Sequence, residues 1–251
     1  MARRASFWLV VLLAPTVGGC VARSRLPSYK ESRFRMLIGG ETRTATGEMS
    51  EDAVQKEVDR LLAMQPARPV PAKVLLYEVE SSSTEIESAH KRLLLRKETA
   101  AAMKAALEKT GLFEQIDFLP DIYLPPSAGD SLKTLRIAAA RAHADGLLLY
   151  ATETGYEVRL NWFAALYPTI LGAFVAPGTR EAHLAESKAV LVDVKTGYIY
   201  QVFQSYGDDS RLAPPVFIDS GDLEYGARKA AMDGLAALAA ERVAAMGGGA
   251  D

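Results

Sequence analysis

The sequence predicts an α+β fold, in which a small mixed or antiparallel sheet carries helices packed on one face as a two-layer sandwich. Three observations predict this fold. Between residues 72 and 152, apolar runs of strand length alternate with longer runs of helical periodicity. Two further strand runs flank the turn Lys195-Thr196-Gly197, which predicts a hairpin. A final run at 221–246 repeats apolar residues at helical spacing.

The elements follow the order β-α-β-α-β, then the hairpin, then a helix. Gly111 fits the C′ position of the first helix of this run, Pro120 stops the second strand, and Gly146 precedes the third. Gly197 supplies the positive φ that the hairpin turn needs. The predicted elements are strands at 72–79, 112–119, 147–152, 189–194 and 198–205, and helices at 88–109, 132–143 and 221–246.

Four regions follow from this pattern. The sequence predicts a signal peptide at 1–19, a tether at 20–71, an α+β domain at 72–246 and a disordered tail at 247–251. Within the tether, residues 50–64 predict a short helix, and the prolines after it predict an extended linker.

Cys20 is the one cysteine of the chain, and it ends a segment with the layout of a secretory signal. Two arginines come first, an uncharged apolar core follows at 7–14, and two glycines lead to the cysteine. The last four residues, Val17-Gly18-Gly19-Cys20, resemble a bacterial lipobox. The resemblance implies that Cys20 becomes the lipidated first residue of the mature protein.

Two alternatives to a lipid anchor remain open at this point. One is a cleaved secretory signal, and the other is an uncleaved N-terminal helix with an incidental cysteine. The apolar core is short for a membrane span, which needs about 20 residues.

One acyl chain holds a protein only marginally, so a stable anchor needs a further signal.

Composition gives no indication of nucleic-acid binding. The whole chain carries a formal charge of −2, and without its first 19 residues it has 27 basic against 31 acidic residues. We therefore expect no nucleic-acid partner. With Cys20 modified, no thiol remains for a disulfide or a thiolate metal site.

The segment 160–176 (LNWFAALYPTILGAFVA) is uncharged and crowded with large apolar side chains. It could be a helical excursion buried on the sheet, a loop that faces a membrane or another subunit, or a membrane span, which Pro168 disfavours. We expect the candidate membrane or partner contact to be Trp162, Phe163, Leu166, Tyr167, Ile170, Leu171 and Phe174.

The sequence offers no catalytic or metal motif, so we expect no enzyme, no cofactor and no metal site. His90, His143 and His183 lack the spacing of a metal pair, and the serines at 81–83 fit turn chemistry. An enzyme would instead need a cleft that brings a histidine within hydrogen-bonding reach of a serine or carboxylate.

Several segments in series resemble the rhombotarget lipoproteins, a bacterial family found alongside rhomboid-type proteases. They are the lipobox, the strand after the proline-rich linker and the long helix, followed by residues 113–129, 144–150, 161–178 and 190–200. The resemblance covers about residues 72–245 and rests on order and spacing. The layout is more distantly similar to curli-secretion (CsgG-like) and penicillin-binding-protein-activator lipoproteins, which implies fold alone.

The chain departs from the family pattern at both ends. Residues 21–71 do not match it. The glycines at 247–249 lack the membrane helix and basic residues that substrates of the associated proteases carry.

The predicted function is that of a non-catalytic binding or assembly module, lipid-anchored in the bacterial envelope and facing the periplasm. Val21 follows the anchor where an aspartate would signal inner-membrane retention, which favours the outer membrane. We expect the membrane and envelope proteins as partners, with self-association as an option. The alternative is an oligomeric secretion or pore subunit that inserts residues 160–176.

Overall fold

The computed structural model describes residues 23–25, 34, 37, 51–79, 89–124, 131–169 and 174–247. Its sheet has the strand order β3-β2-β4-β5-β6, and β1 pairs with β4 off this path. The strands are β1 Arg23–Arg25, β2 Lys73–Glu78, β3 Gln115–Phe118, β4 Gly146–Leu160, β5 Thr179–Asp193 and β6 Ile199–Ala213. The helices are α2 Glu51–Leu62, α3 Ala89–Glu108, α4 Leu132–Arg141 and α6 Ser220–Gly247, with short 3-10 helices η1 Asp121–Tyr123, η2 Trp162–Leu166 and η3 Pro215–Phe217.

The predicted α+β class and element order are confirmed. Strand β2 lies between β3 and β4 and runs parallel to both, whereas β4, β5 and β6 are antiparallel, so the sheet is mixed. Gly111 and Gly197 have φ values of 67° and 80°, as the predicted helix C′ position and the predicted hairpin turn require. Helix α6 includes Gly247, and the rest of the predicted tail lies outside the described residues.

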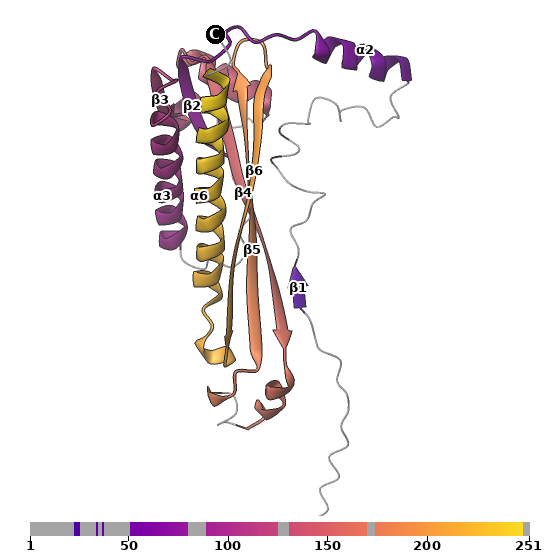
Figure 1. The fold of residues 1–251 in the computed structure, drawn as a ribbon, viewed down its shortest axis with the longest axis vertical. Coiled ribbons are helices and arrows are strands. Elements are labelled where there is room, and N and C mark those ends of the chain that lie inside the picture. Colours follow the sequence, from indigo (N-terminus) through magenta and orange to yellow (C-terminus); the bar gives the residue numbers. More distant parts are fainter. Residues whose placement is uncertain are drawn as a thin grey trace, which may run out of the picture.

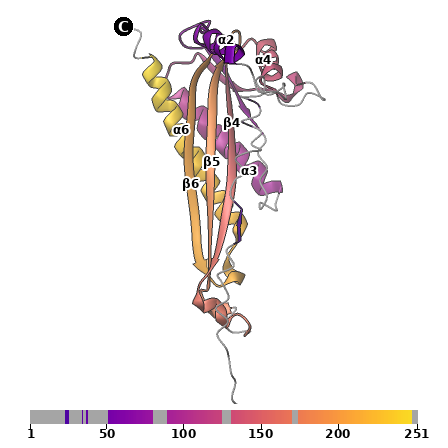
Figure 2. The same cartoon turned by 90° about the vertical axis from the view of Figure 1, so that its right-hand side faces the viewer.

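Three long strands give the molecule its elongated shape (Figures 1 and 2). Each of β4, β5 and β6 has 15 residues, which corresponds to about 50 Å of extended chain. Strand β2 pairs with β4 only at residues 146–150, so the far half of the three strands extends beyond the compact head. The sequence predicted much shorter strands, because the far halves are rich in polar residues.

Helices α3 and α6 cover one face of the sheet, as expected (Figure 1). Their side chains Met103, Leu107 and Leu235 are buried against strand residues such as Leu148 and Phe203. This cluster holds the head and the near half of α6 to the sheet, and burial of each large apolar side chain contributes about 1.5–3 kcal/mol.

Helix α4 packs on the opposite face at the head of the sheet. Its residues Leu135, Ala138 and Ala139 are buried with Leu147 and Leu149, whose side chains alternate with those facing α3 and α6. The head therefore has a partial third layer in addition to the predicted two.

Parts of the region predicted as a tether, 20–71, contact the α+β domain. Strand β1 joins the sheet, and Phe34 and Leu37 are buried in the cluster that contains α4. Both residues lie in the short run 34–38 (FRMLI), which is the one apolar stretch of this otherwise polar part of the sequence. Helix α2 forms close to its predicted range, at the head end of the molecule (Figure 2).

Candidate functional site

The uncharged segment between β4 and β5 forms a tip at the far end of the three long strands (Figure 1). The described part of this tip is residues 161–169 and 174–178, including η2. Ile170 and Leu171 lie outside the described residues. Of the three arrangements that the sequence left open, the described residues show a projecting loop and no helix buried against the sheet.

Asn161 organises the base of the tip. Its side-chain oxygen accepts a hydrogen bond from the backbone N–H of Phe163 (2.9 Å) and caps η2, while its amide nitrogen donates to the carbonyl of Pro177 (3.0 Å). Its backbone N–H donates to the carbonyl of Gly178 (2.8 Å). These bonds join the start of the tip to its end, so the loop has a defined closed base.

The large side chains of the tip point mostly into solvent. Trp162 is 74% exposed, Phe174 is 52% exposed and Val175 is 73% exposed. The Trp162 and Phe163 rings stack with centroids 3.7 Å apart. Leu166 is also exposed, and none of the η2 residues is buried. So much apolar surface at one end of a protein is typical of a membrane or protein contact.

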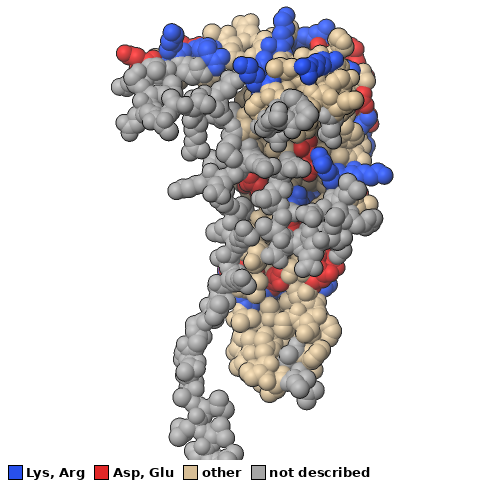
Figure 3. Space-filling model, turned by 180° about the vertical axis from the view of Figure 1, so that it is seen from behind, with Lys and Arg blue, Asp and Glu red and all other residues tan. Residues whose placement is uncertain are grey.

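Tyr167 is the polar member of the predicted set. Its hydroxyl shares a hydrogen bond with the hydroxyl of Thr179 (2.8 Å), so it ties the tip to the first residue of β5. In Figure 3 the described surface of the tip contains no charged residue, whereas Lys, Arg, Asp and Glu are spread over the rest of that face.

Strand β1 pairs with the end of β4 that is next to the tip. Strand β1 pairs antiparallel with β4, with Arg23 opposite Val158 and Arg25 opposite Tyr156. Because β4 runs toward the tip, β1 runs away from it, and Arg23 is the residue of β1 nearest to the tip. Cys20 lies outside the described residues.

A buried histidine–carboxylate pair lies under α6. His183 Nε2 is 2.8 Å from Glu181 Oε1, and the His183 ring stacks on Tyr156. The His183 side chain is 1% exposed and that of Glu181 is 10% exposed, so the pair is largely buried.

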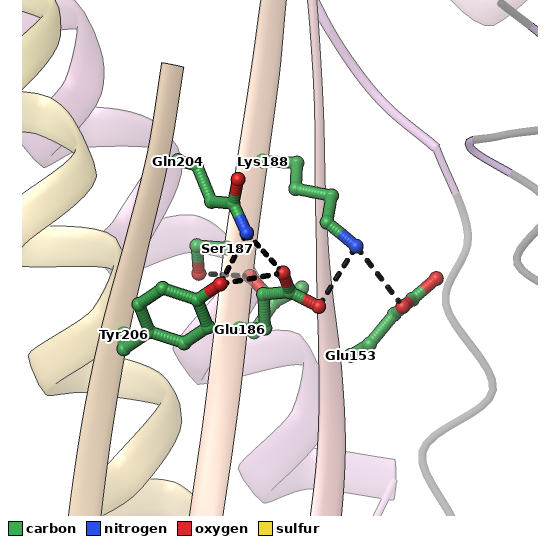
Figure 4. Close-up of polar contacts among 7 residues, drawn as sticks. Glu153, Glu186, Ser187, Lys188, Gln204 and Tyr206 are labelled. Atoms are coloured by element: carbon green, nitrogen blue, oxygen red, sulfur yellow. Dashed lines mark hydrogen bonds and ion pairs between the residues drawn. The ribbon is translucent and has the colours of Figure 1, made fainter. Parts of the chain in front are cut away.

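A second polar cluster joins the three long strands on the opposite face (Figure 4). Lys188 Nζ lies 2.8 Å from Glu186 and 3.6 Å from Glu153, and the Tyr206 hydroxyl donates to Glu186 (3.1 Å). Gln204 also donates to Glu186. Lys188 lies between Glu153 of β4 and Glu186 of β5 and so connects these two strands. The hydrogen bonds from Gln204 and Tyr206 connect β6 to Glu186. The cluster fixes the register of the strands midway along the projection.

Among the residues that the structure describes, no group of three or more His, Cys, Asp or Glu side chains could hold a metal ion. No helix in the described ranges has the length and apolarity that a membrane span requires. His90 and Ser81–Ser83, considered in the sequence as chemical groups, lie where no side chain is described.

The sequence matches no protein-family model and no curated protein. Solved structures give weak matches. A Caulobacter crescentus CB15 protein assigned as a lipoprotein is 11% identical, with 71% of this chain and 92% of that chain covered and a TM-score of 0.34. The PelC dodecamer from Paraburkholderia phytofirmans is 15% identical, with 66% and 88% covered and a TM-score of 0.29. The hypothetical protein CT253 from Chlamydia trachomatis is 12% identical, with 69% and 95% covered and a TM-score of 0.34.

At these TM-scores the matches carry no functional argument for this chain. The resemblance to the rhombotarget lipoproteins, read from the sequence, stays a prediction.

Sequence reasoning missed two features of this site. Strand β1 pairs with the tip end of β4, and Arg159 lies opposite Arg180 at the base. The arginines could have been noticed, because they are the first charged residues on either side of the uncharged stretch. The pairing of β1 had no sequence signal.

Proposed function

We propose that this chain is a lipid-anchored protein of the bacterial cell envelope that acts as a non-catalytic binding or assembly module. In this proposal, acyl chains on Cys20 and the apolar tip enter the same bilayer leaflet. The three long strands then extend away from the membrane. Because a 15-residue strand is about 50 Å long, they separate the head from the bilayer by about this distance.

The observation that carries the proposal is the pairing of β1 with the tip end of β4. Arg23 lies opposite Val158, and the tip begins three residues after Val158, at Asn161. Cys20 is three residues before Arg23. In this proposal the lipid anchor and the exposed apolar surface therefore meet at one end of the molecule, although Cys20 and Leu160 are 140 positions apart in the sequence.

The energetics favour two contacts that act together. A single acyl chain gives marginal and reversible binding, and stable attachment needs a second contribution. Burial of a large apolar side chain contributes about 1.5–3 kcal/mol. Trp162, Phe174 and Val175 alone would add several kcal/mol on transfer into the bilayer, and Trp suits the interface between headgroups and acyl chains.

The head is the part left free to meet envelope proteins. At that end α2 exposes Val58, Leu61 and Leu62, with Leu62 80% exposed. An amphipathic helix with an uncovered apolar stripe is a common docking element. We therefore place the contact with envelope partners at the head, and the contact with the membrane at the tip. An outer-membrane location facing the periplasm is part of the same proposal.

Metabolic labelling tests the anchor. Cells that express the whole chain are fed a clickable fatty acid, and the purified protein is examined for label. Wild type should carry label and fractionate with membranes, and Cys20→Ser should carry none. Label on Cys20→Ser would contradict the assignment.

Serine substitution tests the tip. The triple variant Phe163→Ser, Ile170→Ser and Phe174→Ser should fold but bind vesicles more weakly when the acyl chains are absent. A matched control replaces Ile137 and Val202, which are about as exposed but lie away from the tip. Unfolding of the triple variant would favour a buried segment and contradict the proposal.

Affinity isolation from membranes tests the assembly role. Wild type should retain specific envelope proteins that Cys20→Ser loses, and substitution of Leu62 by serine should reduce that recovery without releasing the chain from the membrane. Discrete oligomers of the chain in detergent would instead favour the pore-type alternative, and a monomer would count against it.

A further inference from the structure

Two arginines flank the uncharged tip and meet each other at its base. Arg159 is the last charged residue before the tip, and Arg180 is the first one after it. The β4–β5 register places Arg159 directly opposite Arg180, so both side chains lie on the same face of the sheet. Both residues are exposed.

This arrangement is unfavourable for the isolated protein. Like charges directly opposite each other on neighbouring strands destabilise a sheet. Arg159 Nε is 2.8 Å from Glu157 Oε1, which offsets one of the two charges. In the part of the chain that the structure describes, the Arg180 side chain makes no hydrogen bond or ion pair. The Arg180 guanidinium therefore has no acidic partner among the described residues, and it lies beside the Arg159 guanidinium on the same face.

We propose that Arg159 and Arg180 bind the phosphates of lipid headgroups and give the tip a preference for anionic membranes. The inference rests on the proposed function, in which the tip enters a bilayer. Residues next to the tip then lie at the depth of the headgroups. A guanidinium donates two parallel hydrogen bonds to phosphate, and two guanidinium groups on one face can hold adjacent phosphates.

The positions of Arg159 and Arg180 in the sequence fit a location at the depth of the lipid headgroups. From Arg159 the chain enters the tip through Leu160 and Asn161, and Trp162 follows at once. Interfacial tryptophan and basic residues at headgroup level are the usual flanks of a segment that enters a membrane. A basic residue at an anionic surface improves binding by about fivefold. The two arginines should together give a preference of more than tenfold.

Vesicle flotation tests the inference. The chain from residue 20 onward, with Cys20→Ser, contains every described residue and lacks the acyl chains. It is mixed with vesicles of phosphatidylcholine alone or of equal parts phosphatidylcholine and phosphatidylglycerol. We expect wild type to bind both, and to bind the anionic vesicles more than tenfold more tightly at low salt, with the preference falling as salt is added.

Three variants make the test specific. Arg159→Gln with Arg180→Gln should remove the preference and keep the binding to neutral vesicles. Glu157→Gln should increase the preference, because it frees the Arg159 guanidinium. Lys97→Gln with Lys133→Gln removes the same charge from exposed positions of the head and should leave the preference unchanged.

The outcomes separate this inference from the proposed function. A preference that survives the double arginine variant, or that falls equally in the lysine control, overturns the headgroup site and leaves the tip contact standing. Absence of wild-type binding to either vesicle overturns both. Displacement of the protein from anionic vesicles by millimolar inorganic phosphate would assign the arginines to a soluble anion and overturn the lipid site.

Discussion

Gly207 of β6 lies directly under Ala231 of α6. A Cβ atom on Gly207 would collide with the backbone nitrogen of Ala231 and with the carbonyl oxygen of Ala227. Ala185 of β5, Ala227 and Ala231 form a small buried cluster at this crossing. Small residues thus let α6 approach the long strands along the projection, where the large core side chains of the head are absent.

Replacement of Gly207 by alanine should therefore destabilise the protein. The added methyl group has to displace backbone atoms of α6, which costs about 1–3 kcal/mol. Urea unfolding followed by circular dichroism measures the loss. Ser210→Ala, at an exposed position of the same strand, should change the stability by less than about 0.5 kcal/mol. Equal stability of Gly207→Ala and wild type would contradict the close approach.

The buried pair of Glu224 and Arg228 gives a second prediction. The Glu224 side chain is 1% exposed, lies 3.6 Å from Arg228 and accepts a hydrogen bond from Thr154 (3.0 Å). Arg228→Met should cost about 3–5 kcal/mol, because it leaves a buried carboxylate without its cation.

The double variant Glu224→Gln with Arg228→Met should be more stable than Arg228→Met alone, since the charge is removed together with its partner. A double-mutant cycle by urea unfolding measures the coupling. Strictly additive losses would show that the two side chains do not interact.

Asp193 predicts a dependence of stability on pH. Burial alone would raise its pKa, but hydrogen bonds from the N–H groups of Thr196 and Ala67 and from the Tyr200 hydroxyl outweigh this and lower the pKa of the carboxyl below its ordinary value. The charged form is thus favoured in the folded state. Its contribution is complete above the unfolded pKa of about 3.9 and is lost as pH falls through the lower folded value.

Asp193→Asn should accordingly be less stable than wild type at pH 7, by about 1.5–3 kcal/mol. The difference should shrink as pH falls below about 4. Unfolding curves between pH 7 and pH 3 measure it, with Asp233→Asn at an exposed helix position as the control. A difference that stays constant over this range would sink the prediction.

The elements of the head could be predicted because each has a local pattern. Helix α3 repeats Leu95, Thr99, Met103 and Leu107 at a spacing of four residues, and all four are buried. Strand β2 is a short continuous apolar run, and Gly111 and Gly197 have the positive φ that glycine adopts easily. The far halves of the long strands could not be predicted as easily. Residues such as Glu153, Glu186 and Lys188 look like loop charges in sequence, and they become strand residues because they pair with one another across the sheet.

The tip shows a different limit. The large apolar side chains Trp162 and Phe174 fit a buried helix as well as an exposed loop. The sequence therefore identified the segment as unusual but did not show whether its side chains are buried or exposed. The proposed position of the tip beside the lipid anchor depends on β1, which is a three-residue strand with two arginines. A strand of this kind is recognised only from its partner, because nothing in its composition favours a sheet.

Fluorescence of Trp162 tests the central claim most directly. The other tryptophan, Trp8, lies in the proposed signal peptide, so the chain from Cys20 onward contains Trp162 alone. The lipidated protein is reconstituted in vesicles with lipids brominated along the acyl chain. The account predicts a blue-shifted emission that the brominated lipids quench and that aqueous iodide does not. Emission that iodide quenches and brominated lipids leave unchanged would place the tip in water and contradict the account.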